Sequence, residues 1–195
     1  VNKFPHAPWW DYDLKSEQTI IDNHWGNPSA EILGYLWKYQ NLIQEWDITA
    51  LVERALQYFE RLDEFESEHE IYCYLHLYHY LPNEYKERIQ ANLRKAVNSL
   101  VVYDQTKWNN YVPQPVHFLK ERGDIESWFK PRAIHRNLLY LKSKLENDYA
   151  IFPTWEWGTY PKHWSSARKH WMGTLTIRAL SHLKYFSTTD IRGCL

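Results

Sequence analysis

The chain has 195 residues, enough for one domain with a substantial hydrophobic core. Its 23 Lys and Arg nearly balance 24 Asp and Glu, so the formal net charge is −1. That balance argues against a nucleic-acid partner or an anionic membrane surface, because both require a basic excess. No run of 18 apolar residues occurs, so we expect no membrane span.

The sequence starts at Val1, with neither an initiator Met nor an apolar signal core, and is therefore expected to derive from a longer protein. The two cysteines, Cys73 and Cys194, are far apart and predict no disulfide framework. A reducing, cytoplasmic location is the expectation.

Aromatic residues are unusually frequent: 11 Trp, 15 Tyr and 7 Phe make up 17% of the chain. This exceeds what a core of this size needs, and it predicts that part of the aromatic surface lines a ligand site. The alternative is that these side chains only pack between helices.

Helical patterns begin after an irregular aromatic segment, residues 1–26. Asn27 as cap and Pro28 at the first helical position predict a helix whose apolar positions continue to Ile43. Asp47 is predicted to cap a second helix with a clear apolar stripe.

A third helix is predicted over residues 67–81, where Ser67 and Glu70 form a capping-box pattern. Its tyrosines alternate with apolar residues, which is a strand period. The flanking segments are helical and a lone strand would have no partner, so we predict a central helix that is apolar on all sides. A fourth helix follows at 89–100.

The second half is predicted to contain short helices at 115–121 and 124–129, and a longer helix opened by Pro131. An aromatic loop, residues 147–163, precedes a last long helix that begins after Ser165 or Ser166. Helices joined by short loops pack as antiparallel neighbours. The sequence therefore predicts one all-α domain over residues 1–195.

Five stretches carry a resemblance to a known family: residues 5–10, 27–34, 145–149, 155–158 and 171–176. They resemble α/α-toroid proteins, the group of terpenoid cyclases and protein prenyltransferase β-subunits, and in particular small squalene-cyclase-like bacterial and fungal proteins. The resemblance implies antiparallel helix pairs around an aromatic-lined cavity that binds an isoprenoid. Fold alone does not define function.

The chain departs from the cyclase repeat, which runs Gln, two residues, Asp-Gly, then Trp after one more residue. Leu145 stands in place of the Gln, Tyr149 in place of the Gly and Ile151 in place of the Trp, while Asp148 keeps the acid. The repeat is degenerate, and the chain is shorter than a complete cyclase.

An isoprenoid cyclase needs an acid beside aromatic faces that stabilise a carbocation. The cyclase acid motif is Asp-x-Asp-Asp, and Asp11 and Asp13 match its first and middle acids, with Leu14 at the last position. The alternative is a solvated pair of loop carboxylates.

A carbohydrate-active site is the second interpretation, because Trp faces stack on sugars and paired carboxylates cleave glycosidic bonds. Glu156 lies between Trp155 and Trp157 and would be the acid, with Asp11 or Asp13 as its partner. The alternative is that Glu156 pairs with Arg168 or Lys169 at the surface.

A metal site is the less favoured interpretation. On a helix, His69, Cys73 and His76 would share one face, and zinc accepts such ligands. His163 and His170, seven residues apart, offer a weaker possibility. A buried Cys and a hydrogen-bonded His are the commoner outcome in an apolar run, so we expect neither a metal nor a cofactor.

The function expected from the sequence is binding, with or without conversion, of a small apolar ligand; a glycan is the second ligand class and a non-catalytic protein-interaction domain the third interpretation. The candidate acids are Asp11, Asp13 and Glu156. The candidate ligand-binding residues are His6, Trp9, Trp10, Trp25, Trp155, Trp157, Trp164 and Trp171.

Overall fold

The computed structural model describes residues 11–17, 19, 24–119, 124–158 and 160–190. Every regular element in these ranges is an α-helix or a 3-10 helix, which confirms the all-α class. None of these helices is long and apolar enough to cross a lipid bilayer. The contacts divide into two compact units, unit 1 (residues 1–100) and unit 2 (residues 101–195), and the single domain expected from the sequence stays a prediction.

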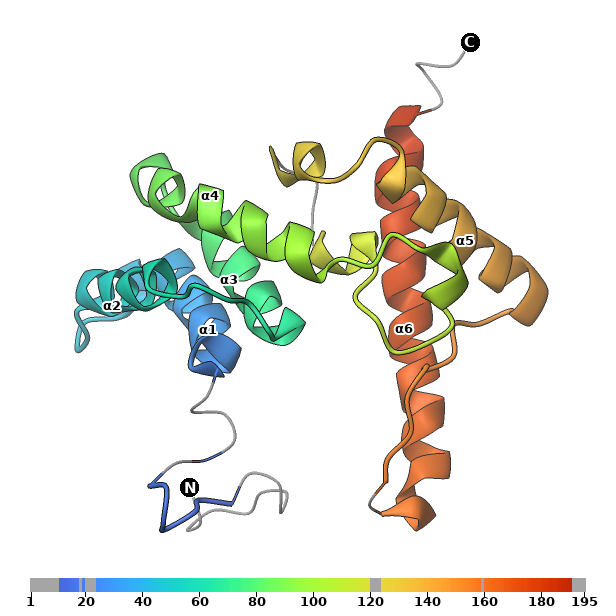
Figure 1. Cartoon of the computed structure of the whole chain (residues 1–195), viewed down its shortest axis with the longest axis horizontal. Helices are drawn as coiled ribbons and strands as arrows, with labels where there is room; N and C mark the ends of the chain where they lie inside the picture. The colour runs from blue at the N-terminus through green and yellow to red at the C-terminus, as the bar shows by residue number, and fades with distance from the viewer. Residues whose placement is uncertain (1–10, 18, 20–23, 120–123, 159, 191–195) are drawn as a thin grey trace. The chain divides into compact units, whose positions relative to one another are not determined.

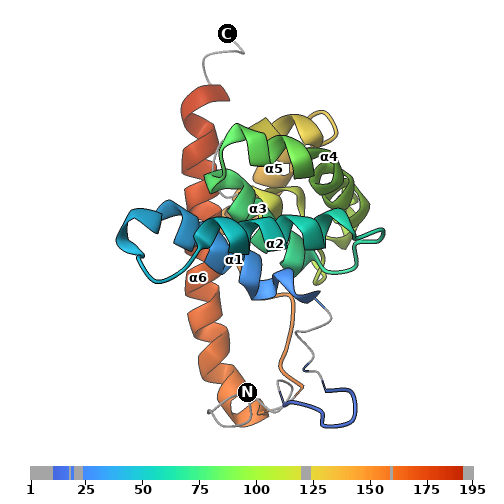
Figure 2. The same cartoon turned by 90° about the vertical axis from the view of Figure 1, so that its left-hand side faces the viewer.

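The described part of unit 1 contains four α-helices, which Figures 1 and 2 show packed together. Helix α3 contacts α1 and α4, and α2 contacts the same two helices. A short 3-10 helix, η3 (Gln40–Leu42), follows α1. The bounds of the four helices are α1 (Gly26–Lys38), α2 (Ile48–Glu60), α3 (Glu68–Tyr80) and α4 (Asn83–Leu100).

The structure confirms the predicted caps Asp47 and Ser67, whereas α1 begins at Gly26, one residue before the predicted cap Asn27, whose backbone is non-helical (φ −105°, ψ 109°). The Asp47 carboxylate accepts a hydrogen bond from the Ala50 N–H at 3.0 Å, and the Ser67 hydroxyl accepts one from the Glu70 N–H at 3.3 Å. The predicted extension of the first helix to Ile43 is wrong. The backbone leaves the helical conformation at Tyr39 (φ −111°, ψ 20°), so α1 ends at Lys38.

Helix α3 lies at the centre of unit 1 and is buried on nearly all sides, as predicted from its apolar composition. The Tyr74 hydroxyl donates a hydrogen bond to the Ala55 carbonyl of α2 at 3.0 Å, so its polar atom is satisfied inside the core. Helix α1 approaches closely at Gly34, where a Cβ would lie 3.2 Å from the Leu77 Cα. Only glycine fits this contact without a shift of α1 or α3.

Unit 2 contains α5 (Ala133–Asp148) and α6 (Pro161–Asp190), preceded by three 3-10 helices, η4 (Gln105–Lys107), η5 (Pro115–Phe118) and η6 (Asp124–Trp128). Helix α5 contacts both η5 and α6 (Figure 1). The predicted start of the last helix at Ser165 or Ser166 is wrong. Pro161 opens α6, because its fixed φ suits the first helical position.

A chain of buried polar groups holds the irregular part of unit 2 on α5. The Asn137 Oδ1 accepts from the Val116 N–H at 3.0 Å, and the Asn137 Nδ2 donates to the Gln114 Oε1 at 2.8 Å. The Gln114 Nε2 in turn donates to the Trp108 carbonyl at 3.0 Å. Asn137 is fully buried, and these bonds satisfy its amide.

Candidate functional site

An open hollow in unit 2 lies between the aromatic loop and the first turns of α6. Its volume is about 310 Å³, at the lower end of the range for small-molecule sites. We call it the aromatic hollow, and it is lined by Pro153, Thr154, Trp155, Glu156, Trp164 and Arg168.

The loop that carries the hollow is fixed at several points. Tyr149 ends α5 with a left-handed backbone (φ 59°), and Tyr160 adopts the same conformation (φ 58°) directly before Pro161. Between them, the Ile151 N–H donates a hydrogen bond to the Thr176 hydroxyl of α6 at 3.0 Å. The loop is therefore held along α6 rather than extended into solvent.

The structure brings together four of the tryptophans singled out from the sequence. Trp155 packs against Trp171 with ring centroids 5.4 Å apart and an interplanar angle of 78°, and the centroid of the Tyr111 ring lies 5.6 Å from that of Trp155. Trp157 packs against Trp164 at 5.5 Å and 45°. Because Trp155 and Trp164 both line the aromatic hollow, the two pairs form one cluster.

The hollow also carries two groups of opposite charge. Both Glu156 and Arg168 are exposed at its edge, and the Arg168 guanidinium lies 5.3 Å from the centre of the Phe152 ring. Within the described ranges no ion pair joins Glu156 to Arg168 or Lys169. The site therefore offers an aromatic face with one acceptor and one donor group for a polar ligand.

The candidate acids Asp11 and Asp13 lie in an exposed turn of unit 1. The Asp13 carboxylate accepts from the Lys15 N–H at 3.0 Å and from the Ser16 hydroxyl at 2.9 Å. The Lys15 bond is the main cause that lowers the pKa of Asp13. These bonds favour the ionised carboxylate, whereas a general acid must hold its proton.

The other predicted ligand-binding residues belong to the first 25 residues of the sequence. Trp25 belongs to unit 1, where its ring lies 5.5 Å from the Tyr58 ring and 5.8 Å from the Arg54 guanidinium. His6, Trp9 and Trp10 lie outside the described residues.

Glu70 in unit 1 is a candidate acid that the sequence did not reveal. Its side chain is buried, accepts from the Gly26 N–H at 2.8 Å and lies 3.6 Å from the His24 Nδ1. Burial raises the pKa of the Glu70 carboxyl, and the contacts with Gly26, His24 and Tyr58 offset only part of this rise. The capping-box pattern predicts a local role for Glu70 at the start of its own helix. The buried environment of its carboxyl depends instead on the long-range contact with Gly26, which the sequence does not indicate.

The three residues weighed as metal ligands face different surroundings. The Cys73 Sγ lies 3.7 Å from the Asn27 Oδ1, and the His76 ring lies 4.3 Å from the Tyr35 ring, while the exposed His69 lies beside Glu68. Within the described part of the chain, no three His, Cys, Asp or Glu side chains gather as metal ligands would.

Comparisons with known proteins give no identification. No protein-family model, no curated protein and no solved structure matches the chain. The resemblance to α/α-toroid proteins therefore rests on the sequence motifs alone.

Proposed function

We propose that this protein binds a ligand whose flat rings have polar edges, and that the aromatic hollow of unit 2 is the binding site. The observation that carries the proposal is a hollow lined by Trp155, Trp164, Glu156 and Arg168, in which each of the two tryptophans packs against a further tryptophan. Tryptophan faces provide stacking area at low cost in conformational entropy, and the two charged groups orient a ligand through its polar edge.

Charged side chains line the open hollow, and this favours a ring ligand with polar edges over a fully apolar chain. An isoprenoid gains its affinity from apolar burial on all sides, whereas Glu156 and Arg168 would lose hydration beside it without gaining a partner. Sugars and nucleosides both present a ring with hydrogen-bonding edges, so the chemistry that we propose is shared by these two sources.

Intrinsic tryptophan fluorescence of the full chain, titrated with oligosaccharides, nucleotides and prenyl diphosphates, tests the proposal. We expect quenching and a raised melting temperature with ring ligands, and roughly tenfold weaker binding in Trp164→Ala, as for loss of one stacking face. Trp46→Ala is the matched control, since Trp46 is 58% exposed and lies in unit 1. A panel without any response would reject the ring-binding site and favour a protein-interaction domain.

Isoprenoid binding in an α/α-toroid is the second candidate, and two observations support it. Consecutive helices contact one another in three pairs, α1 with α2, α3 with α4 and α5 with α6, although α1 makes its most extensive contact with α3. Glu70, a buried carboxyl with a raised pKa, lies in the same unit as the Trp25–Tyr58 ring pair. Protection from thermal unfolding by a prenyl diphosphate, reduced in Glu70→Gln but not in Trp164→Ala, would place this candidate first.

A further inference from the structure

The two units carry opposite charges. Unit 1 has 9 Lys and Arg against 16 Asp and Glu, a formal net charge of −7, while unit 2 has 14 against 8, a formal net charge of +6. The balance of −1 for the whole chain describes neither unit. Unit 2 by itself therefore has the excess of basic residues that a polyanionic partner requires.

Three of the 14 Lys and Arg of unit 2 lie in the first ten residues of α6, and one of them, Arg168, lines the aromatic hollow. Residues 161–170, the first ten of α6, have eight exposed positions, of which five are Lys, Arg or His and none is acidic. We call these five residues the basic face: Lys162, His163, Arg168, Lys169 and His170. Within the described ranges no carboxylate forms an ion pair with Lys162, Arg168 or Lys169, so their charges are available to a ligand.

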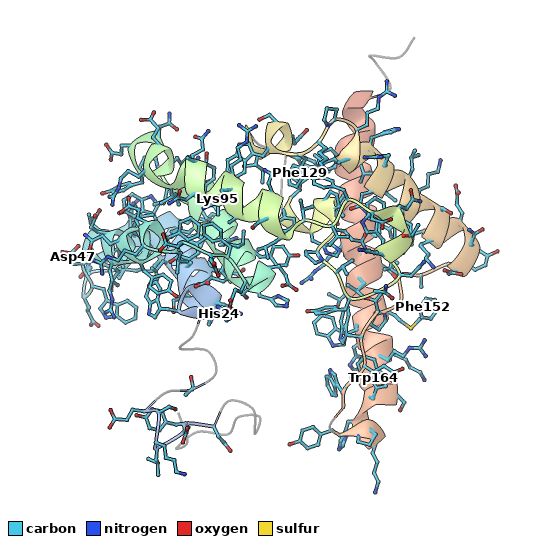
Figure 3. All side chains as sticks on the ribbon, viewed as in Figure 1. His24, Asp47, Lys95, Phe129, Phe152 and Trp164 are labelled. Atoms are coloured by element: carbon cyan, nitrogen blue, oxygen red, sulfur yellow. The ribbon has the colours of Figure 1, made fainter. Side chains whose placement is uncertain are left out.

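The basic face and the tryptophans occupy the same turns of α6. Trp164 lies one turn before Arg168, the residue of this group that also lines the hollow, and packs against Trp157, which is 39% exposed. Figure 3 places Trp164 on α6 and Phe152 on the loop before it, and the Arg168 guanidinium lies over that Phe152 ring. Arg168 thus offers a cation for a phosphate group beside ring faces for bases.

We propose that unit 2 binds single-stranded nucleic acid through the basic face and the aromatic hollow. This inference rests on the ring-binding site proposed above and names its ligand. Aromatic side chains interleaved with Lys and Arg are the usual means of holding unpaired bases and their backbone. Glu156 adds an acceptor for the exocyclic amino group of a base, a group that a sulfated sugar does not require.

Fluorescence anisotropy of a labelled 15-nucleotide oligodeoxycytidylate with the full chain tests the inference. We expect binding that weakens as the salt concentration rises. The double variant Arg168→Ala/Lys169→Ala removes two phosphate contacts, so the negative slope of log K against log salt should become less steep by about 1.4. Trp157→Ala should weaken binding about tenfold at every salt concentration, because it removes a stacking face and no charge.

Matched controls lie in the same unit and in the other one. Lys142→Ala/Lys144→Ala removes two cations of α5 that already pair with Glu146 and Asp148, and it should leave both affinity and slope nearly unchanged. Trp46→Ala removes an exposed tryptophan of unit 1 and should have no effect. Circular dichroism of each variant verifies that the helices remain.

Three outcomes would overturn the inference. Equal affinity for a sulfated oligosaccharide or for phosphatidylserine vesicles would mean that the basic face binds polyanions in general. If Trp157→Ala and Trp164→Ala both leave the oligonucleotide affinity unchanged, the ring-binding site is rejected together with this inference. Tryptophan quenching by neutral sugars, without any oligonucleotide binding, would keep the proposed function and reject only the nucleic-acid ligand.

Discussion

Glu70 is the residue whose ionisation is most closely tied to the packing of unit 1. Its side chain is 5% exposed, and burial raises its pKa above the ordinary value of 4.5. Because the folded-state pKa is raised, the contribution of this group to stability is fully present below pH 4.5 and is lost as the pH rises through the folded-state pKa.

Replacement of Glu70 by Gln should remove this pH dependence. The amide oxygen can still accept from the Gly26 N–H, which the Glu70 carboxylate now binds at 2.8 Å, but it does not ionise. We expect the free energy of unfolding of Glu70→Gln, measured relative to that of the wild type, to increase as the pH rises above 4.5. Urea denaturation from pH 4 to pH 8 measures the difference, and parallel pH profiles for the two proteins would contradict it.

Glu70→Ala is the companion variant, since it removes the acceptor as well as the charge. It leaves the buried Gly26 N–H without its bond, and relative to Glu70→Gln this should cost about 1–3 kcal/mol at every pH. A cost in Glu70→Ala together with a gain in Glu70→Gln at pH 7 would separate the hydrogen bond from the buried charge.

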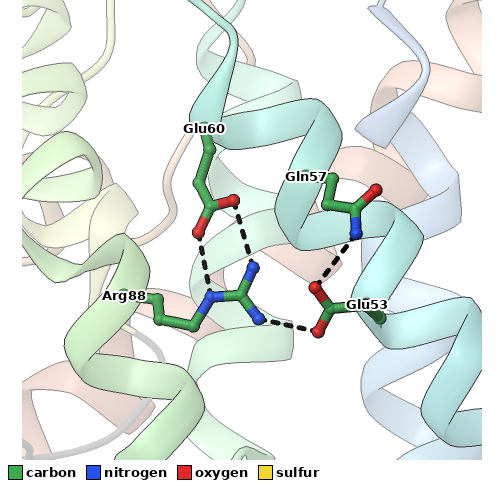
Figure 4. A network of polar contacts seen from close by, with 4 residues as sticks. All are labelled: Glu53, Gln57, Glu60 and Arg88. Carbon is green, nitrogen blue, oxygen red and sulfur yellow. Dashed lines mark hydrogen bonds and ion pairs between the residues drawn. The ribbon is translucent and has the colours of Figure 1, made fainter.

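At the scale of elements, α2 and α4 are joined by an arginine that binds two carboxylates (Figure 4). The Arg88 Nη1 donates to the Glu53 Oε2 at 2.7 Å, while its Nε and Nη2 donate to the two oxygens of Glu60 at 2.9 and 3.1 Å. Gln57 also donates to Glu53. Such a fork fixes both the distance and the rotation of the two helices.

Arg88→Ala should destabilise unit 1 by about 1 kcal/mol, a modest value because all three side chains are about one third exposed. Arg88→Lys should recover less than half of this, since an ammonium group cannot form the fork. The exposed Arg94 on the same helix has no ion pair with a described residue, so Arg94→Ala is the matched control. A lower denaturation midpoint for Arg88→Lys than for Arg88→Ala would contradict this geometry.

The same contact predicts an acid limit. Hydrogen bonds from Arg88, followed by Gln57, lower the pKa of Glu53 below 4.5. A lowered folded-state pKa gives stability that is present above pH 4.5 and is lost as the pH falls through the folded-state pKa. The difference in stability between the wild type and Arg88→Ala should therefore shrink below pH 4.5.

In unit 2, the buried amide of Asn137 connects α5 to η5. Asn137→Ala would leave the Val116 N–H and the Gln114 Oε1 without their bonds, which are now 3.0 and 2.8 Å long. Two unsatisfied buried groups should cost about 2–4 kcal/mol. Asn137→Asp keeps the acceptor but places a carboxylate beside the Gln114 oxygen, so it should be at least as destabilising at pH 7, and stability equal to the wild type would contradict the assigned bonds.

For the molecule as a whole, the sequence predicted local features well. Asp47 and Ser67 were found as caps because their hydrogen bonds reach only three residues along the chain. Four of the seven predicted tryptophans form two ring pairs, because residues 155–171 form one loop and the helix that follows it, while their role in ligand binding stays a prediction. Periodicity and capping are short-range properties, and the sequence contains them directly.

Long-range properties were missed for a corresponding reason. The bond between Glu70 and the Gly26 N–H joins residues 44 positions apart, and no local pattern encodes it. Trp25 was grouped with the tryptophans of the second half although it packs within unit 1. The opposite charges of the two units depend on the boundary after Leu100, which the contacts of the folded chain define.

Whether the two units unfold together is the prediction that belongs to the whole chain. Each unit has its own buried side chains, such as Leu77 and Tyr74 in unit 1 and Trp108 and Asn137 in unit 2. A unit with a core of its own can unfold as a cooperative unit. We therefore expect two calorimetric transitions rather than one.

Two variants assign the transitions. Gly34→Ala places a Cβ 2.9 Å from the His76 Cδ2 and 3.2 Å from the Leu77 Cα, so it should lower only the melting temperature of unit 1, by several degrees. Asn137→Ala should lower only that of unit 2. If both variants instead shift a single transition by similar amounts, the chain unfolds as the one cooperative domain that its sequence predicts, because destabilisation of either core is then shared by the whole molecule.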